Sequence, residues 1–142
     1  MNKWSLRKPI PGDIIRIDIN KDYHHYGIYV SDDEVIQYGL AKDILKPNNS
    51  VKVLKSNIND FRMSKFVEVR EYTLVEKLTK NKPAKVIEKA RARLGEAKYD
   101  ILNNNCSHFV NECVFNKHVK EDYLNNKQYK KHKSNIIQQI FK

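Results

Sequence analysis

Three segments in the N-terminal third of the chain carry the hydrophobic pattern of β-strands: residues 14–19, 26–30 and 34–38. In the first, isoleucine recurs at every second position from Ile15 with charged residues between, which is typical of a half-buried strand. The other two are rich in β-branched and aromatic residues. Because only the three polar residues 31–33 separate them, we predict an antiparallel hairpin that pairs Val30 with Glu34.

The pattern weakens in the middle of the chain and then changes to helical spacing. Residues 41–50 have the composition of a loop, residues 51–54 predict a short strand, and residues 66–72 predict a clearer one. A helix is predicted from Pro83, which suits a first helical turn, to a stop at Gly95.

A second helix is predicted after three consecutive asparagines. Its apolar stripe consists of Cys106, Phe109, Val110, Cys113 and Val114. Strands followed by helices in a chain of 142 residues indicate one α+β domain, in which an antiparallel β-sheet packs against helices.

The chain turns polar and basic beyond Lys117. Near its end, four apolar residues predict a short amphipathic helix, and these are Ile136, Ile137, Ile140 and Phe141. We therefore expect a globular domain over residues 1–117 and a basic, amphipathic tail over residues 118–142.

The formal net charge of +10 favours an anionic partner, either RNA or an anionic membrane surface. Of the 27 basic residues, 21 are lysine and six are arginine, so the side chain best suited to bidentate base contacts is scarce. A lysine-rich composition without any partner is the alternative. No stretch reaches the roughly 18 apolar residues of a membrane span, and no apolar segment follows the basic N-terminus as in a signal peptide. With only two cysteines, we expect a cytoplasmic protein, at most peripheral to membranes.

Cys106 occupies the predicted start of the second helix. Asn104 or Asn105 suits the N-cap position, where a side-chain oxygen accepts an otherwise unpaired amide hydrogen. The amides and the dipole at a helix start favour a thiolate over a thiol, which makes Cys106 a candidate nucleophile. The alternative is that Cys106 only packs in the core. Cys113 lies about 10 Å further along the axis, too far for a disulfide with Cys106, and is expected in the core.

A nucleophilic thiolate needs a base, and His24 and His25 are the candidates. As neighbours in one strand they face opposite sides of the sheet, so only one of them can meet the thiol. The predicted hairpin places Gln37 opposite Gly27, which makes His25 and Gln37 diagonal neighbours about 7 to 8 Å apart between Cα atoms. Because an amide can orient an imidazole, we expect His25 to be the base and Gln37 its orienting residue.

Zinc is an alternative use of the same residue types. The candidate ligands are His24, His25, Cys106, His108 and Cys113. They lack the C-x-x-C or H-x-x-x-H spacing of zinc sites, so neither a metal nor another cofactor is expected.

Two blocks of the sequence together resemble the lecithin:retinol acyltransferase family. Its His-containing N-terminal hairpin is similar to PGDIIRIDINKDYHHYGIYVSDDEVIQYG, and its Asn-Cys-Glu-His-Phe motif at a helix start is similar to NNCSHFVNECVFN. The resemblance extends over roughly residues 9–117. It implies a permuted form of the NlpC/P60 papain-like fold, in which the His strand precedes the Cys helix, and it makes residues 1–117 a catalytic domain.

Carried onto this chain, the resemblance implies Cys106 as the acyl-accepting nucleophile and His25 as the general base. The third polar residue of the family, commonly His, falls on Gln37, and Ser107 stands where the family usually has Glu. A glutamine can orient an imidazole but cannot take up a proton.

The leading hypothesis is a cysteine-dependent acyltransferase or phospholipase-type hydrolase that forms a thioester on Cys106 with a lipid or other acyl substrate. A cysteine amidase or peptidase of the NlpC/P60 type would use the same residues. The third hypothesis is a non-catalytic module, like that proposed for the viral H-box/NC relatives, which binds RNA or an anionic membrane.

Overall fold

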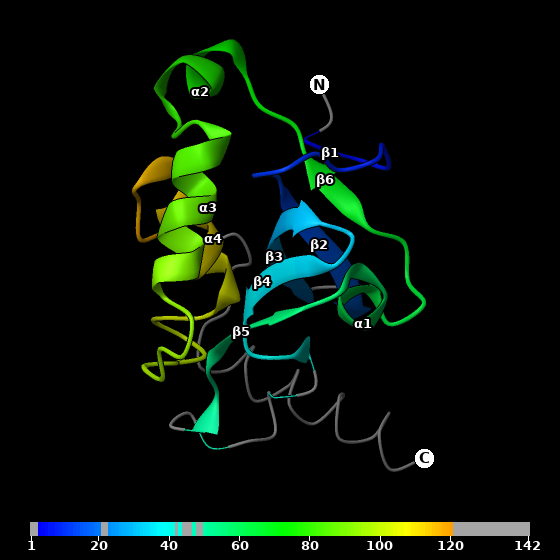
Figure 1. Ribbon diagram of the computed structural model, residues 1–142, viewed down its shortest axis with the longest axis vertical. Helices are drawn as coiled ribbons and strands as arrows, with labels where there is room; N and C mark the ends of the chain where they lie inside the picture. The colour runs from blue at the N-terminus through cyan, green and yellow to red at the C-terminus, as the bar shows by residue number, and fades with distance from the viewer. Residues whose placement is uncertain (1–2, 21–22, 42, 44–46, 48–49, 121–142) are drawn as a thin grey trace.

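The computed structural model describes residues 3–20, 23–41, 43, 47 and 50–120. Within them, six strands form one antiparallel sheet in the order β1-β6-β2-β3-β4-β5 (Figure 1). The strands are β1 (Trp4–Ser5), β2 (Ile14–Asn20), β3 (Tyr23–Ser31), β4 (Glu34–Tyr38), β5 (Val53–Ser56) and β6 (Glu68–Arg70). The predicted α+β fold is thereby confirmed, and the strand with the two histidines is a central strand of the sheet.

The helices form two unequal layers. They are α1 (Ile58–Arg62), α2 (Leu74–Thr79), α3 (Pro83–Ala92) and α4 (Cys106–Phe115). In Figure 1, α3 and α4 lie on one side of the sheet, which we call the α4 side, and α1 lies on the other, which we call the α1 side. The strand with the histidines precedes the helix that begins at Cys106, as expected.

Each side of the sheet has its own hydrophobic core. On the α4 side, Tyr26 and Ile28 of β3 belong to the same buried cluster as Cys106 and Phe109 of α4. On the α1 side, the cluster consists of Ile15, Ile17, Tyr29, Val35, Phe61 and Val69. A strand buried on both sides carries apolar residues on both, which is why β3 has no alternation of apolar and polar residues.

Gly27 explains how closely α1 can approach the sheet. A Cβ atom at this position would lie 2.9 Å from the ring of Phe61 and 3.0 Å from Val35. Only glycine leaves room for Phe61, which is the buried residue of α1.

The predicted hairpin is confirmed in its main register and wrong at its tip. Ile28 pairs with Ile36, which places Gln37 opposite Gly27 as predicted. Glu34, however, pairs with Ser31 rather than with Val30, because the register shifts after Tyr29. The shift is confined to the turn, so the relation between His25 and Gln37 is preserved.

The other elements differ from the prediction at their ends. The strand predicted at residues 51–54 is β5, two residues later, and the strand predicted at 66–72 shortens to β6. The helix from Pro83 ends at Ala92, before Gly95, which has a positive φ of 89°. Helices α1 and α2 were not predicted. The predicted terminal helix lies outside the described residues.

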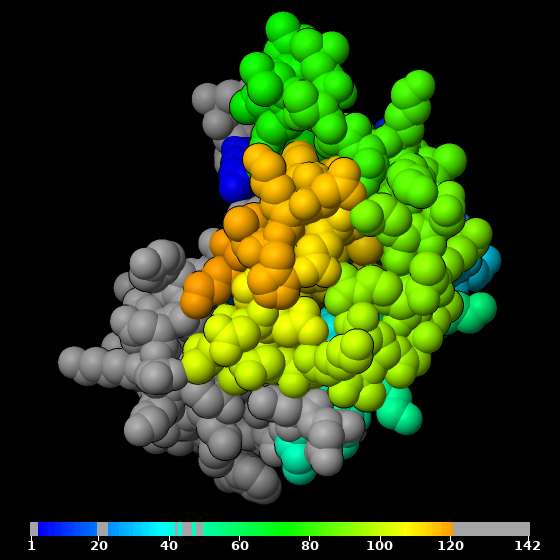
Figure 2. Space-filling model, turned by 90° about the vertical axis from the view of Figure 1, so that its left-hand side faces the viewer, coloured from blue at the N-terminus to red at the C-terminus, as the bar shows by residue number. Residues whose placement is uncertain are grey.

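Figure 2 views the helical layer from the left of Figure 1. The surface there is formed by α2, α3, the segment before α4 and the segment after it, with α2 at one end. This cover agrees with the burial of eight of the ten residues of α4. Within the described residues, no helix combines the length and apolarity that a membrane span requires.

Candidate active site

Cys106 is the first residue of α4, as predicted, and Asn105 is the N-cap. The Oδ1 atom of Asn105 accepts hydrogen bonds from the backbone amides of Ser107 at 2.9 Å and His108 at 3.3 Å. In return, the amide of Asn105 donates to Nδ1 of His108 at 3.1 Å, so the two residues form a capping box. His108 therefore has a structural role at this helix start. The cap holds Cys106 where the helix dipole favours a negative charge.

The two cysteines have different surroundings, although both are buried and neither forms a disulfide. Cys113 lies in the core, as predicted, and burial raises the pKa of its thiol to about 12. Nearby Arg93 and Lys89 oppose that rise only in part. Cys113 is therefore a packing residue. Cys106, which is 2% exposed, is the cysteine located at the start of the helix.

His25 and Gln37 form the predicted contact. The Nε2 atom of His25 lies 2.6 Å from Oε1 of Gln37, whose Nε2 atom donates to Oγ of Ser56 at 2.7 Å. Since the amide nitrogen of Gln37 is the donor to Ser56, its oxygen faces the imidazole and accepts a hydrogen from Nε2 of His25. The ring of Phe61 lies 5.4 Å from the imidazole between centroids.

The pKa of His25 is lowered from 6.5 to about 4, chiefly because the ring is buried. The hydrogen bond to Gln37 and the charge of Asp43 oppose this effect without reversing it. At neutral pH, His25 is a neutral, sealed side chain.

The structure does not bring His25 and Cys106 together. His25 and Gln37 point to the α1 side with Phe61, whereas Cys106 belongs to the core on the α4 side. The neighbours of His25 and Gln37 in sequence, Tyr26 and Tyr38, are the ones that face α4. This corrects the expected orientation. The contact with Gln37 is confirmed, but it lies on the opposite side of the sheet from Cys106.

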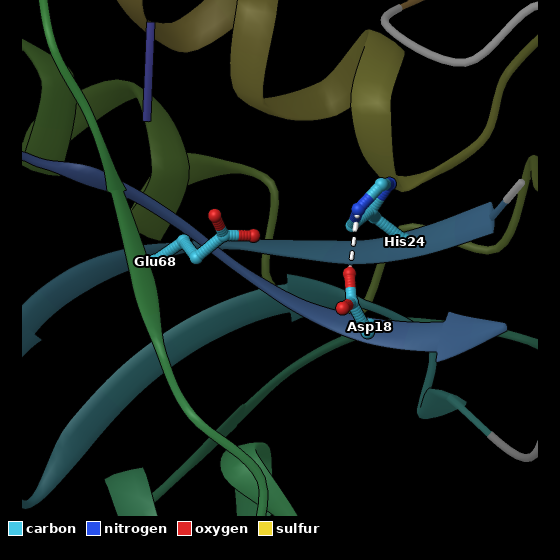
Figure 3. A group of neighbouring side chains, drawn as sticks. All are labelled: Asp18, His24 and Glu68. Carbon is cyan, nitrogen blue, oxygen red and sulfur yellow. Dashed lines mark ion pairs between the residues drawn. The ribbon is translucent and has the colours of Figure 1, made fainter. Parts of the chain in front are cut away.

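His24 faces the α4 side. It pairs with Asp18 of β2 in the sheet register, and its Nε2 atom lies 2.6 Å from Oδ1 of Asp18. In Figure 3 its imidazole points away from the sheet toward the nearer end of α4. The side chain is 17% exposed, so it is covered but reached by water. Asp18 was not singled out from the sequence. The signal was its place between two isoleucines of a half-buried strand, which turns it to the opposite side from them.

A second acidic residue, Glu68, lies beside this pair. One possible ligand atom from each of Asp18, His24 and Glu68 lies within 4.8 Å of the other two (Figure 3). A metal ion would have to bring these atoms closer together. Glu68, however, already binds Arg16 at 3.0 Å, and the guanidinium of Arg16 stacks 4.0 Å from the centroid of the Trp4 ring. This positive charge opposes a cation. The group is better described as a His24–Asp18 pair beside an Arg16–Glu68 ion pair.

Comparison with known families gives a match over most of the chain. The sequence model described as lecithin retinol acyltransferase matches residues 7–119. The matched span contains β2, β3, β4 and α4, and therefore His24, His25 and Cys106. A comparison with individual curated proteins finds no match.

Proposed function

Because the chain belongs to the lecithin retinol acyltransferase family, we propose that it is a cysteine-dependent acyl-transfer enzyme in which Cys106 is the nucleophile. The observation that carries the proposal is the position of Cys106 as the first residue of a capped helix within the matched span. The substrate class that we propose is a lipid ester or another activated acyl compound.

The proton acceptor in this proposal is His24, held by Asp18. The resemblance assigns the base to His25 and its orientation to Gln37, but those two lie across the sheet from the thiol. A base with a pKa of about 4 is also poorly matched to proton transfer near neutral pH. His24 has the same chemistry on the α4 side, and a carboxylate orients its ring, as in cysteine and serine triads.

The charges around His24 suit a transient imidazolium. Asp18 contributes a negative charge at 2.6 Å, and the positive charge of Arg16 is balanced by Glu68. Cys106, at the start of α4, belongs to the core on the same side of the sheet, and the hydroxyl of the next residue, Ser107, donates to Oδ1 of Asn105. A carboxylate near the ring stabilises the protonated form that the reaction creates.

The reaction has two balanced steps. In the first, the proton of the Cys106 thiol passes to His24, Sγ bonds to the carbonyl carbon of the ester, and the ester C–O bond breaks as the alkoxide takes that proton. In the second, water or an acceptor amine or alcohol gives a proton to His24 and bonds to the carbonyl carbon of the thioester, the C–S bond breaks, and the Cys106 sulfur takes that proton from His24 to become a thiol again. Positive charge at the start of α4 stabilises the oxyanion in both steps.

The experiment is a search for the covalent acyl intermediate. The protein is incubated with vesicles of several phospholipid classes, and in parallel with acylated peptides, and its intact mass is measured. We expect an acyl-sized mass increase that is absent in Cys106→Ala and retained in Cys113→Ala, which removes the buried thiol of the same helix. No adduct and no fatty-acid release from any lipid class, in a protein that is folded by circular dichroism, contradicts the proposal. Adducts from peptides alone would move the proposal to an amidase.

A second candidate is a non-catalytic binding module for an anionic partner. The 2% exposure of Cys106 and the net charge of +10 favour it. It predicts binding to RNA or anionic vesicles that weakens steeply with salt and is the same in Cys106→Ala. Binding without any acyl adduct would select this candidate.

A further inference from the structure

Helix α2 carries its apolar residues on the outside. Leu74, Val75 and Leu78 are 73%, 69% and 78% exposed, and α2 buries no residue at all. They occupy positions i, i+1 and i+4, so they gather on one side of the helix. We call these three residues the α2 patch. Single exposed apolar residues are common, but three on one short helix are a candidate interaction site.

The polar side of α2 is the side fastened to the protein. Glu76 closes a capping box with Thr73 and also binds Arg70 of β6 at 2.8 Å. Arg70 is only 5% exposed, so this ion pair anchors the helix from within the body of the protein. Because Glu76 points inward, the leucines must point outward. The exposure of the α2 patch is thus built into the fold and is not a frayed end.

Exposed lysines lie near the α2 patch in the sequence. Lys77 lies within α2, and Lys82 and Lys85 follow it at the start of α3, where Lys85 also lies 3.4 Å from Glu88. In Figures 1 and 2, α2 stands at one extremity of the molecule, above the helical layer. A protruding apolar tip with exposed lysines within and just after it in the sequence suits the boundary between acyl chains and anionic headgroups. A protein partner would need a broader apolar surface than one six-residue helix presents.

We infer that α2 docks the protein on an anionic lipid surface, with the α2 patch inserted among the acyl chains and Lys77, Lys82 and Lys85 at the headgroups. The inference stands without the proposed function, since it concerns binding only. Together with it, docking would hold the domain on the surface that contains its ester substrate.

The experiment measures partitioning of the full-length chain onto sucrose-loaded vesicles of phosphatidylcholine with and without phosphatidylserine. All proteins carry Cys106→Ala, so that hydrolysis cannot alter the vesicles and failure of the proposed function cannot affect the result. The test variant is Leu74→Ser, Val75→Ser and Leu78→Ser. The matched control is Leu6→Ser and Phe66→Ser, which removes two apolar residues that are 68% and 81% exposed elsewhere.

We expect the test variant to bind the phosphatidylserine vesicles at least ~10-fold more weakly, and the control variant to bind within about twofold of the parent, since apolar area at the inserting helix is lost only in the former. Thermal melting checks that both remain folded. Equal binding by the parent and test variant overturns the inference, and so does an equal loss in the control. A parent that forms dimers which the test variant does not, with no difference on vesicles, overturns it in favour of a self-association surface.

Discussion

The two sides of β3 give the same type of side chain, an imidazole, opposite environments. On the α4 side, the His24 side chain is 17% exposed and has a carboxylate partner, Asp18. On the α1 side, His25 is 2% exposed, has an amide partner, Gln37, and lies under the ring of Phe61. The two imidazoles therefore differ in the charge of their partner and in their access to water. The sealed core, where its partner carries no charge, keeps His25 neutral.

The comparison separates two roles that a sequence motif joins. The His25–Gln37–Ser56 chain of hydrogen bonds links β3, β4 and β5 and satisfies buried polar groups between them. The His24–Asp18 pair links β2 and β3 under the helix that begins at Cys106. The first arrangement stabilises the sheet, and we propose that the second does the chemistry.

The sharpest test of the comparison replaces each of the two histidines in turn by glutamine. We expect His24→Gln to slow formation of the acyl adduct about 10²- to 10⁴-fold, the usual contribution of a general base, and His25→Gln to slow it far less. The pH profile of Cys106 alkylation by iodoacetamide, located by peptide mass, gives a readout that a merely structural role would not move. In His24→Gln, and to a smaller degree in Asp18→Asn, the apparent thiol pKa should rise toward roughly 8.5, that of a free thiol.

A profile that moves in His25→Gln and not in His24→Gln or Asp18→Asn would reverse the assignment. Asp18 is 70% exposed, so Asp18→Asn decides the matter even where a histidine variant fails to fold. A wild-type Cys106 that does not react at any pH would remove the thiol from the chemistry altogether.

The second prediction concerns the acid stability that His25 imposes. Its pKa is about 4 in the folded protein and 6.5 when unperturbed, so the unfolded chain binds more protons between these values. The stability due to neutral His25 is therefore complete above pH 6.5 and is lost as the pH falls toward 4, at up to about 1.4 kcal/mol per pH unit. Urea unfolding from pH 7 to pH 4 measures it.

His25→Gln should flatten this dependence, and Phe61→Ala should weaken it by letting water reach the imidazole. His24→Gln serves as the matched control on the other side of the sheet. An equal loss of stability on acidification in the parent and in His25→Gln would show that burial does not hold His25 neutral.

The smallest effect is expected at the cap of α4. Asn105→Ala removes the oxygen that accepts from Ser107 and His108 and should cost about 1 to 2 kcal/mol of unfolding free energy. It should also raise the apparent pKa of the Cys106 thiol without changing the titration of His25. Asn105→Ser, which keeps an acceptor, should recover much of the stability, as read from urea midpoints. A loss of stability without a change in the apparent pKa of the Cys106 thiol would show that the cap does not influence the thiol.

Local rules predicted the parts of the molecule that depend on neighbours in sequence. Capping and hairpin geometry predict an N-cap at Asn104 or Asn105, which is Asn105 in the structure, the start of a helix at Pro83, and the contact between His25 and Gln37. The side toward which His25 points could not be predicted in this way. Tyr26, Gly27 and their neighbours in β3 are buried on both sides, so no polar face marks which side meets α4.

Helix α2 was missed for a related reason. Its signal, the capping box of Thr73 and Glu76, is present in the sequence, but its apolar residues do not form a stripe that a core requires. A pattern search that assumes apolar residues point inward passes over a helix fastened by its polar side. Helix α1, with five residues and one buried side chain, is too short for periodicity to reveal.

The histidine doublet has a consequence for shifts in the register of β3. Insertion or deletion of one residue between β2 and β3 would move every side chain of β3 to the other side of the sheet, which is disruptive for nearly any residue. For the imidazole it is neutral, because one histidine would replace the other under α4. A shift of β3 by one residue would therefore still leave an imidazole on the side of the sheet that α4 covers.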